Sequence, residues 1–272
     1  MPHPRVATMP LSYSIDDLLE LMAQLRNPQG GCPWDRQQTF TSLAPHTIEE
    51  AYEVGDAIDR GDMSSLQDEL GDLLFQVVFY AQLAKEQSLF DFTGVVTAVV
   101  TKLRRRHPHV FGNGSAGTLE QLNKAWEDIK TAERAARGEE TTSLLDGISC
   151  GLPGFTRALK LQKRAARVGF DWEDGCAVLD KLEEEAEELR QERADGGPPE
   201  RIFEEMGDVL FTCVNLARHH QVDPETALRA ANRRFEQRFR EMESLAKNQH
   251  RTLDGADLEQ LNDWWEQAKI NC

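Results

Sequence analysis

The sequence predicts an all-α protein made of two tandem helical-bundle modules. Apolar residues recur at spacings of three and four, as in Leu66, Leu70, Leu73 and Val77, which is the pattern of an amphipathic helix. Alternating strand-like runs with hairpin signals are scarce. One pattern of acidic residues also occurs twice within the 272 residues, together with the segments around it. Such a repeat indicates an internal duplication rather than one large domain.

Start and stop signals divide the first half into five expected helices. Ser14 and Thr118 each precede, by three residues, a side chain that can complete a capping box. The β-branched run 95–100 continues with helical spacing, so we expect a buried helix there. Pro108 ends the fourth helix. The expected helices are 14–26, 47–59, 64–85, 91–106 and 118–136.

The second half repeats this order of helices. Asp223 is a good N-cap because Pro224 follows it at the first helical position. The expected helices are 156–168, 174–194, 200–221, 223–247 and 257–269. Glycines, a proline and small polar residues mark 138–153 as a linker between an N-terminal module, 14–137, and a C-terminal module, 154–272.

Composition narrows the classes of function. The formal net charge is −16, which disfavours general binding to nucleic acid because both partners would be negative. We find no apolar run of membrane-spanning length, and residues 1–14 lack the apolar core of a secretion signal. Five scattered cysteines, without a C-x-x-C pair, suit a reducing compartment. We therefore expect a cytoplasmic protein that does not bind membranes.

The repeated acidic pattern consists of two carboxylate pairs in each copy. The first copy comprises Glu50, Glu53, Glu69 and Asp72, and the second comprises Glu185, Glu188, Glu205 and Asp208. Carboxylates three residues apart share one face of a helix. If the two helices of each copy pack antiparallel, four carboxylates converge and repel one another unless a divalent cation binds. An all-oxygen ligand set predicts Mg²⁺, with Mn²⁺ as a substitute.

Structural alternatives apply to parts of this pattern. A single acidic pair usually lies on a solvated helix surface, and Thr47 with Glu50 also fits a capping box. In the second copy Leu182 takes the place of the capping residue and cannot cap. Gly71 and Gly207 precede the aspartates at a cost in helix stability of about 1 kcal/mol, which predicts a close approach by another group.

Basic and aromatic residues follow each acidic pattern. Lys102 with Arg106, and Arg234 with Arg238, stand four residues apart and suit a clamp on phosphates. A water bound to the metal ion is acidified and can attack phosphorus, with Glu49 or Glu184 as the general base that accepts its proton. Trp126 and Trp265 fit core packing at least as well as stacking on a nucleobase. The segments 32–35 and 169–172 fit either of two structures. Each is a loop that brings an aromatic residue close to the nucleobase of a ligand, or each is a packed turn.

Taken together, these motifs resemble the MazG family of nucleoside triphosphate pyrophosphohydrolases. The similarity runs from about residue 18 to residue 269 and is carried by the segments 31–39, 49–53, 69–77, 105–111 and 168–172. It implies tandem MazG modules whose helical bundles are completed by homodimerisation. It also implies Mg²⁺-dependent cleavage of ribo- and deoxynucleoside triphosphates between the α- and β-phosphates, with broad base tolerance and a housekeeping role over nucleotide pools.

The resemblance also implies roles for residues of the C-terminal module. The metal ligands would be Glu185, Glu188, Glu205 and Asp208, which count as catalytic together with Arg234 and Arg238. The nucleotide site would be lined by Lys181, Leu182, Glu184, Glu185, Arg201, Ile202, Glu204, Asp208, Arg234, Arg238 and Trp265. Arg201 and Arg234 replace family lysines, which alters how phosphate is gripped.

Two other functions remain open from the sequence. One is a narrower relative, either a dCTP or dUTP hydrolase or a phosphoribosyl-ATP pyrophosphohydrolase, because these enzymes share the acidic helical module. The other is an acidic interaction or regulatory protein with one degenerate module. The N-terminal module retains its four carboxylates, so its activity cannot be judged from them.

Overall fold

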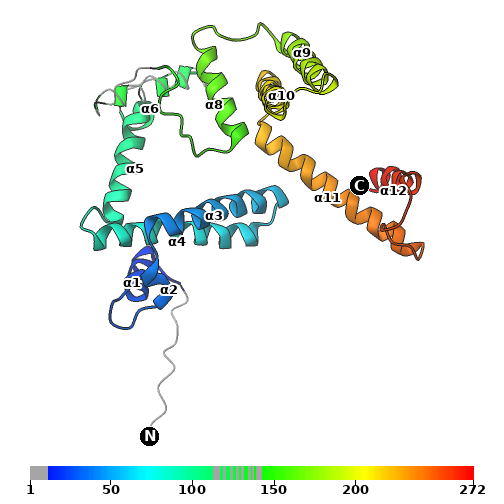
Figure 1. Cartoon of the computed structure of the whole chain (residues 1–272). Helices are drawn as coiled ribbons and strands as arrows, with labels where there is room; N and C mark the ends of the chain where they lie inside the picture. Colours follow the sequence, from blue (N-terminus) through cyan, green and yellow to red (C-terminus); the bar gives the residue numbers. More distant parts are fainter. Residues whose placement is uncertain are drawn as a thin grey trace. The chain divides into compact units, whose positions relative to one another are not determined.

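A computed structural model describes most of the chain (Figure 1). The described residues are 12–112, 117–118, 121–122, 125–126, 129, 132–133, 136, 138 and 143–272. Their regular structure is entirely helical, which confirms the predicted all-α fold class. The chain divides into two compact units, Met1–Glu133 and Arg134–Cys272. No helix in the described ranges is long and apolar enough to span a membrane.

The N-terminal unit is organised around a helical hairpin. Its helices are α1 (Ile15–Leu25), α2 (Pro33–Gln37), α3 (Phe40–Arg60), α4 (Met63–Glu86), α5 (Phe92–Arg106) and α6 (Pro108–Phe111). Helices α3 and α4 lie side by side (Figure 1). Gly61, with φ of +69°, ends α3, and the Asp62 side chain caps α4. Helix α1 packs on α4, and the core of the unit comprises Met22 of α1, Leu43 of α3, and Val78, Phe79 and Leu83 of α4.

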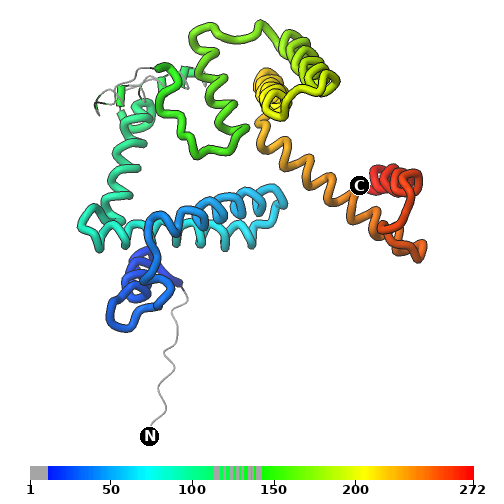
Figure 2. Tube along the Cα trace, in the orientation of Figure 1, coloured from blue at the N-terminus to red at the C-terminus, as the bar shows by residue number. Residues whose placement is uncertain are grey.

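The C-terminal unit repeats the hairpin with α9 and α10. Its helices are α8 (Gly154–Ala166), α9 (Gly175–Ala194), α10 (Pro199–His219), α11 (Pro224–Asn248) and α12 (Leu258–Asn271), and Figure 2 traces their path. Gly196, with φ of +68°, lies in the turn between α9 and α10. Helix α8 packs on α10 and α11, and α11 also packs on α12. The N-terminal end of α11 follows the sequence prediction, because Asp223 accepts a hydrogen bond from the Thr226 amide at 2.9 Å.

One helix start differs from the sequence prediction. Helix α3 begins at Phe40 rather than at 47 because Thr39 and Ser42 form a reciprocal capping box. Thr47 therefore lies inside the helix, where its hydroxyl donates to the Leu43 carbonyl at 3.2 Å. The alternative that Glu50 only completes a capping box is wrong. The short helices α2 and α6 were not predicted, and most of the expected helix 118–136 lies outside the described residues.

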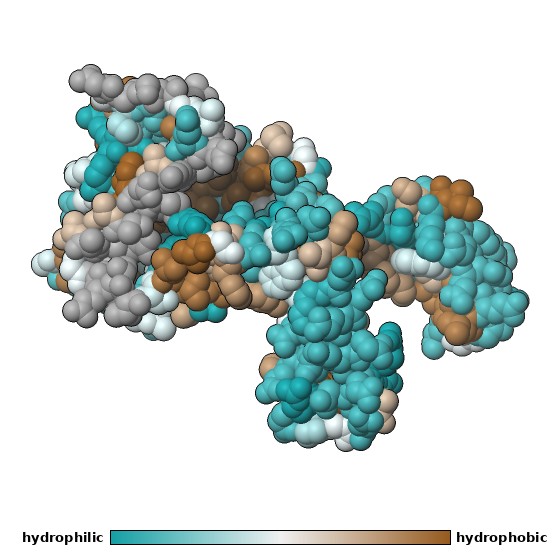
Figure 3. Space-filling model, turned by 90° about the horizontal axis from the view of Figure 1, so that it is seen from above, coloured by the Kyte–Doolittle hydropathy of each residue, from teal (hydrophilic) through white to brown (hydrophobic). Residues whose placement is uncertain are grey.

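The burial predicted for the run 95–100 is wrong within a single chain. Helix α5 contains no buried residue, and Val96, Val99 and Val100 are each about 40% exposed (41%, 39% and 42%). Figure 3 shows that apolar residues, in brown, gather in patches on a largely hydrophilic surface. The β-branched run is helical as expected, but its apolar face has no partner that would bury it within the described part of the chain.

Candidate metal and nucleotide sites

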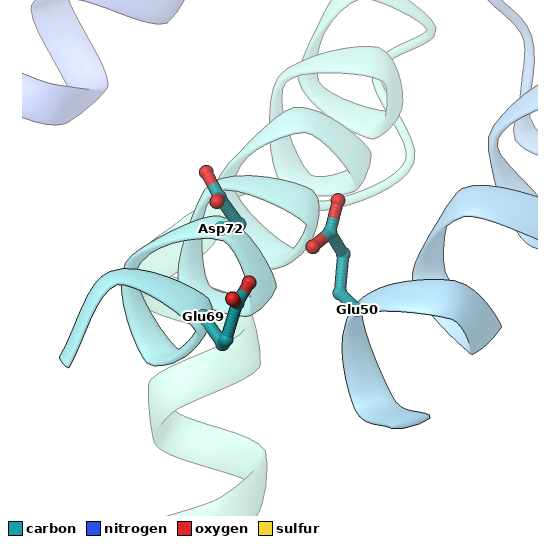
Figure 4. Close-up of side chains that lie close together, drawn as sticks. All are labelled: Glu50, Glu69 and Asp72. Carbon is teal, nitrogen blue, oxygen red and sulfur yellow. The ribbon is translucent and has the colours of Figure 1, made fainter. Parts of the chain in front are cut away.

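The hairpin of the N-terminal unit brings three predicted ligands together. Glu50 comes from α3, whereas Glu69 and Asp72 come from α4, and their carboxylate oxygens lie within 4.8 Å of one another. Figure 4 shows Glu50 facing the pair on the neighbouring helix. Glu53 is not part of this group. The spacing of three residues on α4 and the antiparallel packing of α3 together produce the convergence.

Electrostatics in this first cluster disfavour three free carboxylates. Burial raises the pKa of Glu50, and the charges of Asp72 and Glu53 raise it further. The pKa of Glu69 is also raised, first by burial and then by Glu53 and Asp72. Within the described residues, no lysine or arginine forms an ion pair with Glu50, Glu69 or Asp72. Protonation or a bound cation would therefore stabilise this cluster.

The hairpin of the C-terminal unit forms the equivalent cluster. Glu185 of α9 and Glu205 and Asp208 of α10 offer oxygens within 4.8 Å of one another. Glu185 and Glu205 are buried, with 7% and 5% of their surface exposed, whereas Asp208 is exposed. Glu188 lies outside the group of three. Burial raises the pKa of Glu205, and although Arg201 opposes the shift, the charges of Glu188 and Asp208 add to it.

Two basic side chains already contact this second cluster. Lys181 Nζ lies 2.9 Å from a carboxylate oxygen of Glu185 and 2.9 Å from one of Glu184. Arg201 donates to Glu204 at 2.7 Å and to Glu205 at 2.5 Å. Hydrogen bonds to Glu185 and Glu184 raise the pKa of Lys181. Leu182 and Ile202 are half-buried and lie next to these two basic residues in the sequence. Six of the residues assigned to the nucleotide site by resemblance thus lie in this cluster or are bonded beside it: Lys181, Glu184, Glu185, Arg201, Glu204 and Asp208.

Reasoning from the residues alone missed the ion pairs that Lys181 and Arg201 form with the carboxylates, although their spacing indicates them. Lys181 stands four residues before Glu185, and Arg201 stands four residues before Glu205. A basic residue at this spacing lies on the same helix face as the carboxylate that follows it. Only the family resemblance, and not the spacing, placed them in the site.

The remaining predicted site residues lie on α11 and α12. Arg238 is stacked over the Trp265 ring at 5.9 Å, and Trp265 packs against Phe235 with ring centroids 5.5 Å apart. Arg234 is exposed on the same helix. Among the described residues, neither arginine forms an ion pair with the carboxylates of α9 and α10. The structure therefore gathers Arg238 and Trp265 in one place and the carboxylates in another.

The corresponding residues of the N-terminal unit are engaged with one another. Arg106 forms an ion pair with Glu133, whose pKa is lowered to about 2 by hydrogen bonds and charge from Arg106 and Arg105. Trp126 Nε1 donates to the Arg106 carbonyl at 2.8 Å, and its ring contacts His107 edge to face. This arrangement favours the packing role for Trp126, one of the two roles open from the sequence.

The glycines beside the aspartates have no steric role within one chain. A Cβ added at Gly71 or Gly207 would meet no other atom within 4 Å. The close approach predicted from these glycines is therefore absent between described residues of a single chain. A substrate or a second subunit remains as the group that would need the space.

Comparisons with known proteins match this architecture. The model of the MazG nucleotide pyrophosphohydrolase domain matches residues 38–111, and the model of phosphoribosyl-ATP pyrophosphohydrolase matches residues 152–235. Each match spans the helical hairpin and carboxylate cluster of one unit. Fold and site together place the chain in the class of all-α nucleotide pyrophosphohydrolases.

Full-length relatives define the family more closely. The chain is 49% identical to the nucleoside triphosphate pyrophosphohydrolase of Escherichia coli K12, with 94% of this chain and 97% of the relative aligned. It is 42% identical to the nucleoside triphosphate pyrophosphohydrolase/pyrophosphatase MazG of Thermotoga maritima, over 93% of this chain and 95% of that protein. The chain belongs to the MazG family of nucleoside triphosphate pyrophosphohydrolases.

Proposed function

We propose that the chain hydrolyses ribo- and deoxynucleoside triphosphates in a Mg²⁺-dependent reaction and serves nucleotide-pool housekeeping. Family membership makes it a nucleoside triphosphate pyrophosphohydrolase. In the proposed reaction, water attacks the α-phosphorus, the bond to the bridging oxygen breaks, and nucleoside monophosphate and pyrophosphate leave. The observation that carries the proposal is the cluster of Glu185, Glu205 and Asp208, with oxygens within 4.8 Å and two basic residues beside it.

The donor set of each cluster fits a hard divalent cation. Every donor is a carboxylate oxygen, and Mg²⁺, or Mn²⁺ as a substitute, prefers such ligands. In the C-terminal unit Glu185, Glu205 and Asp208 would hold the ion, with Glu188 one helical turn from Glu185. The ion would neutralise phosphate charge and polarise the phosphoryl group. Burial and neighbouring carboxylates raise the pKa of Glu205 because they disfavour its negative charge, and a bound cation would offset that cost.

Basic residues would then change partners when substrate binds. Lys181 and Arg201 neutralise the carboxylates in the free protein, and a metal ion at the same oxygens would release them toward the phosphates. Glu184, which is exposed and bonded to Lys181, would accept the proton of the attacking water. Arg234 and Arg238 would stabilise the leaving pyrophosphate. This exchange lets a protein of net charge −16 bind a polyanion.

The products of hydrolysis test the proposal directly. The protein is incubated with ATP, dCTP or dGTP and Mg²⁺, with a chelator as the matched control, and the products are resolved. Monophosphate and pyrophosphate in equal amounts, lost with the chelator, are expected. A diphosphate with orthophosphate would exclude cleavage at the α-phosphorus, and full activity in the chelator would exclude the metal.

A second candidate rests on the family model that matches the C-terminal unit. That model describes phosphoribosyl-ATP pyrophosphohydrolase and matches residues 152–235. The same cleavage would then act on one nucleotide with a substituted base. Phosphoribosyl-ATP belongs in the substrate panel beside dCTP and dUTP. A single accepted substrate would favour this narrower function over the broad one.

Homodimerisation is part of the proposal. Exposed apolar side chains lie along both hairpins, including Leu70 and Leu74 on α4 and Met206 and Leu210 on α10, each 41–49% exposed. A second copy that packs against these faces would complete each bundle and use the space beside Gly71 and Gly207. Sedimentation equilibrium should give twice the chain mass, whereas a monomer at micromolar concentration would contradict the proposal.

A further inference from the structure

The two carboxylate clusters differ in the positive charges that already contact them. In the C-terminal unit, Lys181 lies 2.9 Å from Glu185, and Arg201 donates to Glu205 at 2.5 Å. A metal ion can bind these oxygens only if it displaces the two basic side chains or shares the carboxylates with them. Two of the three carboxylates in this cluster are therefore neutralised in the free chain.

The N-terminal cluster lacks this compensation. Glu50, Glu69 and Asp72 form no ion pair with a lysine or arginine in the part of the chain that the structure describes. The charge of Arg60 reaches Glu69, but the guanidinium group of Arg60 bonds to two other aspartates of the hairpin. Three carboxylates with oxygens within 4.8 Å of one another thus repel without a counter-charge in contact with them (Figure 4).

A buried amide points into this N-terminal cluster. Gln76 lies one helical turn after Asp72 on α4 and is only 6% exposed. Burial raises the pKa of Glu50, and a side-chain hydrogen bond from Gln76 opposes that shift. The amide nitrogen makes this bond, because a hydrogen bond that lowers the pKa of a carboxyl group is donated to the carboxylate. Gln76 therefore reaches from α4 to the carboxylate on α3.

The oxygen of the same amide is unsatisfied. Gln76 Oε1 is buried and has no hydrogen-bond partner. It shares one planar amide with the nitrogen that bonds to Glu50, so it lies beside the carboxylates. Buried polar atoms are normally bonded, and a metal ion or a water molecule bound to that ion would satisfy this oxygen. The corresponding residue of the C-terminal unit, four positions after Asp208, is Thr212, which has no amide.

The two clusters also differ in how an ion could enter them. In the N-terminal cluster two carboxylates are half-buried and one is exposed, so an ion from solvent reaches them without moving a charged side chain. In the C-terminal cluster, Glu185 and Glu205 are 7% and 5% exposed and are bonded to Lys181 and Arg201. A triphosphate supplies the negative charge that these two basic residues need once an ion replaces them. There, ion and triphosphate should each favour binding of the other.

We propose that Glu50, Glu69 and Asp72 form a resident cation site, which binds Mg²⁺ or Mn²⁺ without nucleotide, whereas the C-terminal cluster takes up its ion together with the triphosphate. The inference rests on the proposed function, which gives both clusters a divalent cation, and it adds the order in which they fill. The resident ion joins α3 to α4. Gln76 is a positioning residue that orients Glu50 toward the ion.

Equilibrium dialysis of the full chain against MnCl₂ counts the bound ions. The dialysis is performed at pH 7 and about 0.15 M salt, which screens the net negative charge of the protein. Without nucleotide we expect about one tightly bound ion per chain. A second ion should bind when α,β-methylene-ATP is added, because its bridge between the α- and β-phosphorus atoms resists hydrolysis. Two ions of equal affinity without nucleotide, or none until nucleotide is added, would overturn the proposal.

A matched pair of ligand variants assigns each ion to its cluster. Glu69→Gln should raise the Kd of the nucleotide-free ion at least about tenfold, because one ligand charge is lost, and should leave the nucleotide-dependent ion in place. Glu205→Gln should do the reverse. Loss of the nucleotide-free ion in Glu205→Gln, with retention in Glu69→Gln, would show that the clusters fill in the opposite order.

Substitutions of Gln76 test its positioning role. Gln76→Met keeps the length of the side chain but removes the amide, and it should raise the Kd of the nucleotide-free ion about tenfold. Gln76→Glu adds a fourth carboxylate at the same place and should lower that Kd severalfold, which a merely structural residue would not do. Gln82→Met is the matched control, because Gln82 is half-buried on the same helix and bonds to Glu86. Unchanged affinity in both Gln76 variants would refute the role of Gln76.

Failure of the proposed function would be visible separately, because the ion counts need no turnover. A wild-type protein that forms no monophosphate and pyrophosphate from ATP and Mg²⁺ would refute the proposed function. A protein that forms both products but binds two ions of equal affinity without nucleotide would refute only the order of filling. A protein that binds no Mn²⁺ with or without the nucleotide analogue would refute both proposals.

Discussion

The two units hold the same carboxylates in different surroundings. In the N-terminal unit, Glu50 and Glu69 have raised pKa values, and no lysine or arginine among the described residues forms an ion pair with their cluster, although the charge of Arg60 opposes the shift of Glu69. In the C-terminal unit, Lys181 and Arg201 bond to the corresponding cluster and partly neutralise it. The C-terminal cluster therefore has basic side chains bonded to its carboxylates, whereas the N-terminal cluster has no such ion pair among the described residues.

A second difference lies further along the same helices. Asn215 stands ten residues after Glu205, and Phe79 stands ten residues after Glu69. Phe79 is fully buried in the core with Met22 and Leu43, whereas Asn215 lines a pocket and has an unsatisfied donor. The same position contributes core packing in one unit and a buried amide bonded to Arg218 in the other.

Removing one metal ligand from each unit should give the largest difference. Glu205→Gln or Asp208→Asn should lower the release of pyrophosphate about a thousandfold, because charge at the reacting phosphates is lost with little change in shape. Glu69→Gln or Asp72→Asn should leave most of the activity. The measurement is kcat/KM of the full chain with ATP and Mg²⁺. Equal losses from the two pairs of variants would show that both units turn over substrate.

Truncation at the paired positions should separate core packing from a polar contact. Phe79→Ala should destabilise the N-terminal unit by about 3–5 kcal/mol, because it leaves a cavity in the core. Asn215→Leu should cost less, about 1–2 kcal/mol, because it removes the hydrogen bonds that Asn215 Oδ1 accepts from Arg218, whereas its amide nitrogen has no bond to lose. Urea denaturation of the full chain measures both. A cost for Asn215→Leu as large as that for Phe79→Ala would contradict this difference between the two positions.

The pH dependence of stability should differ between the two clusters. The pKa values of Glu50 and Glu69 are raised in the folded state above the ordinary value of 4.5. The folded state therefore binds protons more readily, and metal-free stability falls as the pH rises through this range. At pH 7, Glu69→Gln should raise the metal-free Tm by a few degrees and reduce the further gain from Mg²⁺.

Glu205→Gln is the matched variant in the other unit. There the gain should be smaller, because Arg201 loses the charge of its buried partner. Differential scanning calorimetry at pH 5 and pH 7, with and without Mg²⁺, makes the comparison. A Tm of the metal-free wild type that rises from pH 5 to pH 7 through these groups would contradict the raised pKa values.

Local spacing explains which parts of the site the sequence could predict. Glu69 with Asp72, and Glu205 with Asp208, lie together because three residues make nearly one helical turn, and a short turn folds each hairpin back. The predicted start of α3 at residue 47 was wrong, because the helix begins at the earlier capping box of Thr39 and Ser42. Two capping boxes in series look alike in a sequence.

Convergence of distant segments explains what sequence reasoning could not reach. Gln162, Asp171 and Asn215 come from three elements, and no spacing relates them, so the pocket that they line appears only in the folded unit. From the sequence, the turn 169–172 fits either an aromatic loop near the nucleobase or a packed turn. In the structure, the hydrogen bond from Arg218 to Asp171 ties this turn to α10. The prediction that α5 is buried was wrong. A β-branched run shows that the segment is apolar, but it does not show that another part of the chain covers it.

The glycines beside the aspartates should give the smallest effect and the finest test. Gly71→Ala and Gly207→Ala should each stabilise their unit by about 0.5–1 kcal/mol, since no atom lies within 4 Å of the added Cβ and alanine favours the helix. If substrate occupies the space beside Gly207, then Gly207→Ala should raise KM severalfold while Gly71→Ala leaves it unchanged. If a second subunit occupies it, both substitutions should instead weaken self-association in sedimentation. A gain in stability with no change in KM or assembly would mean that nothing approaches these glycines at all.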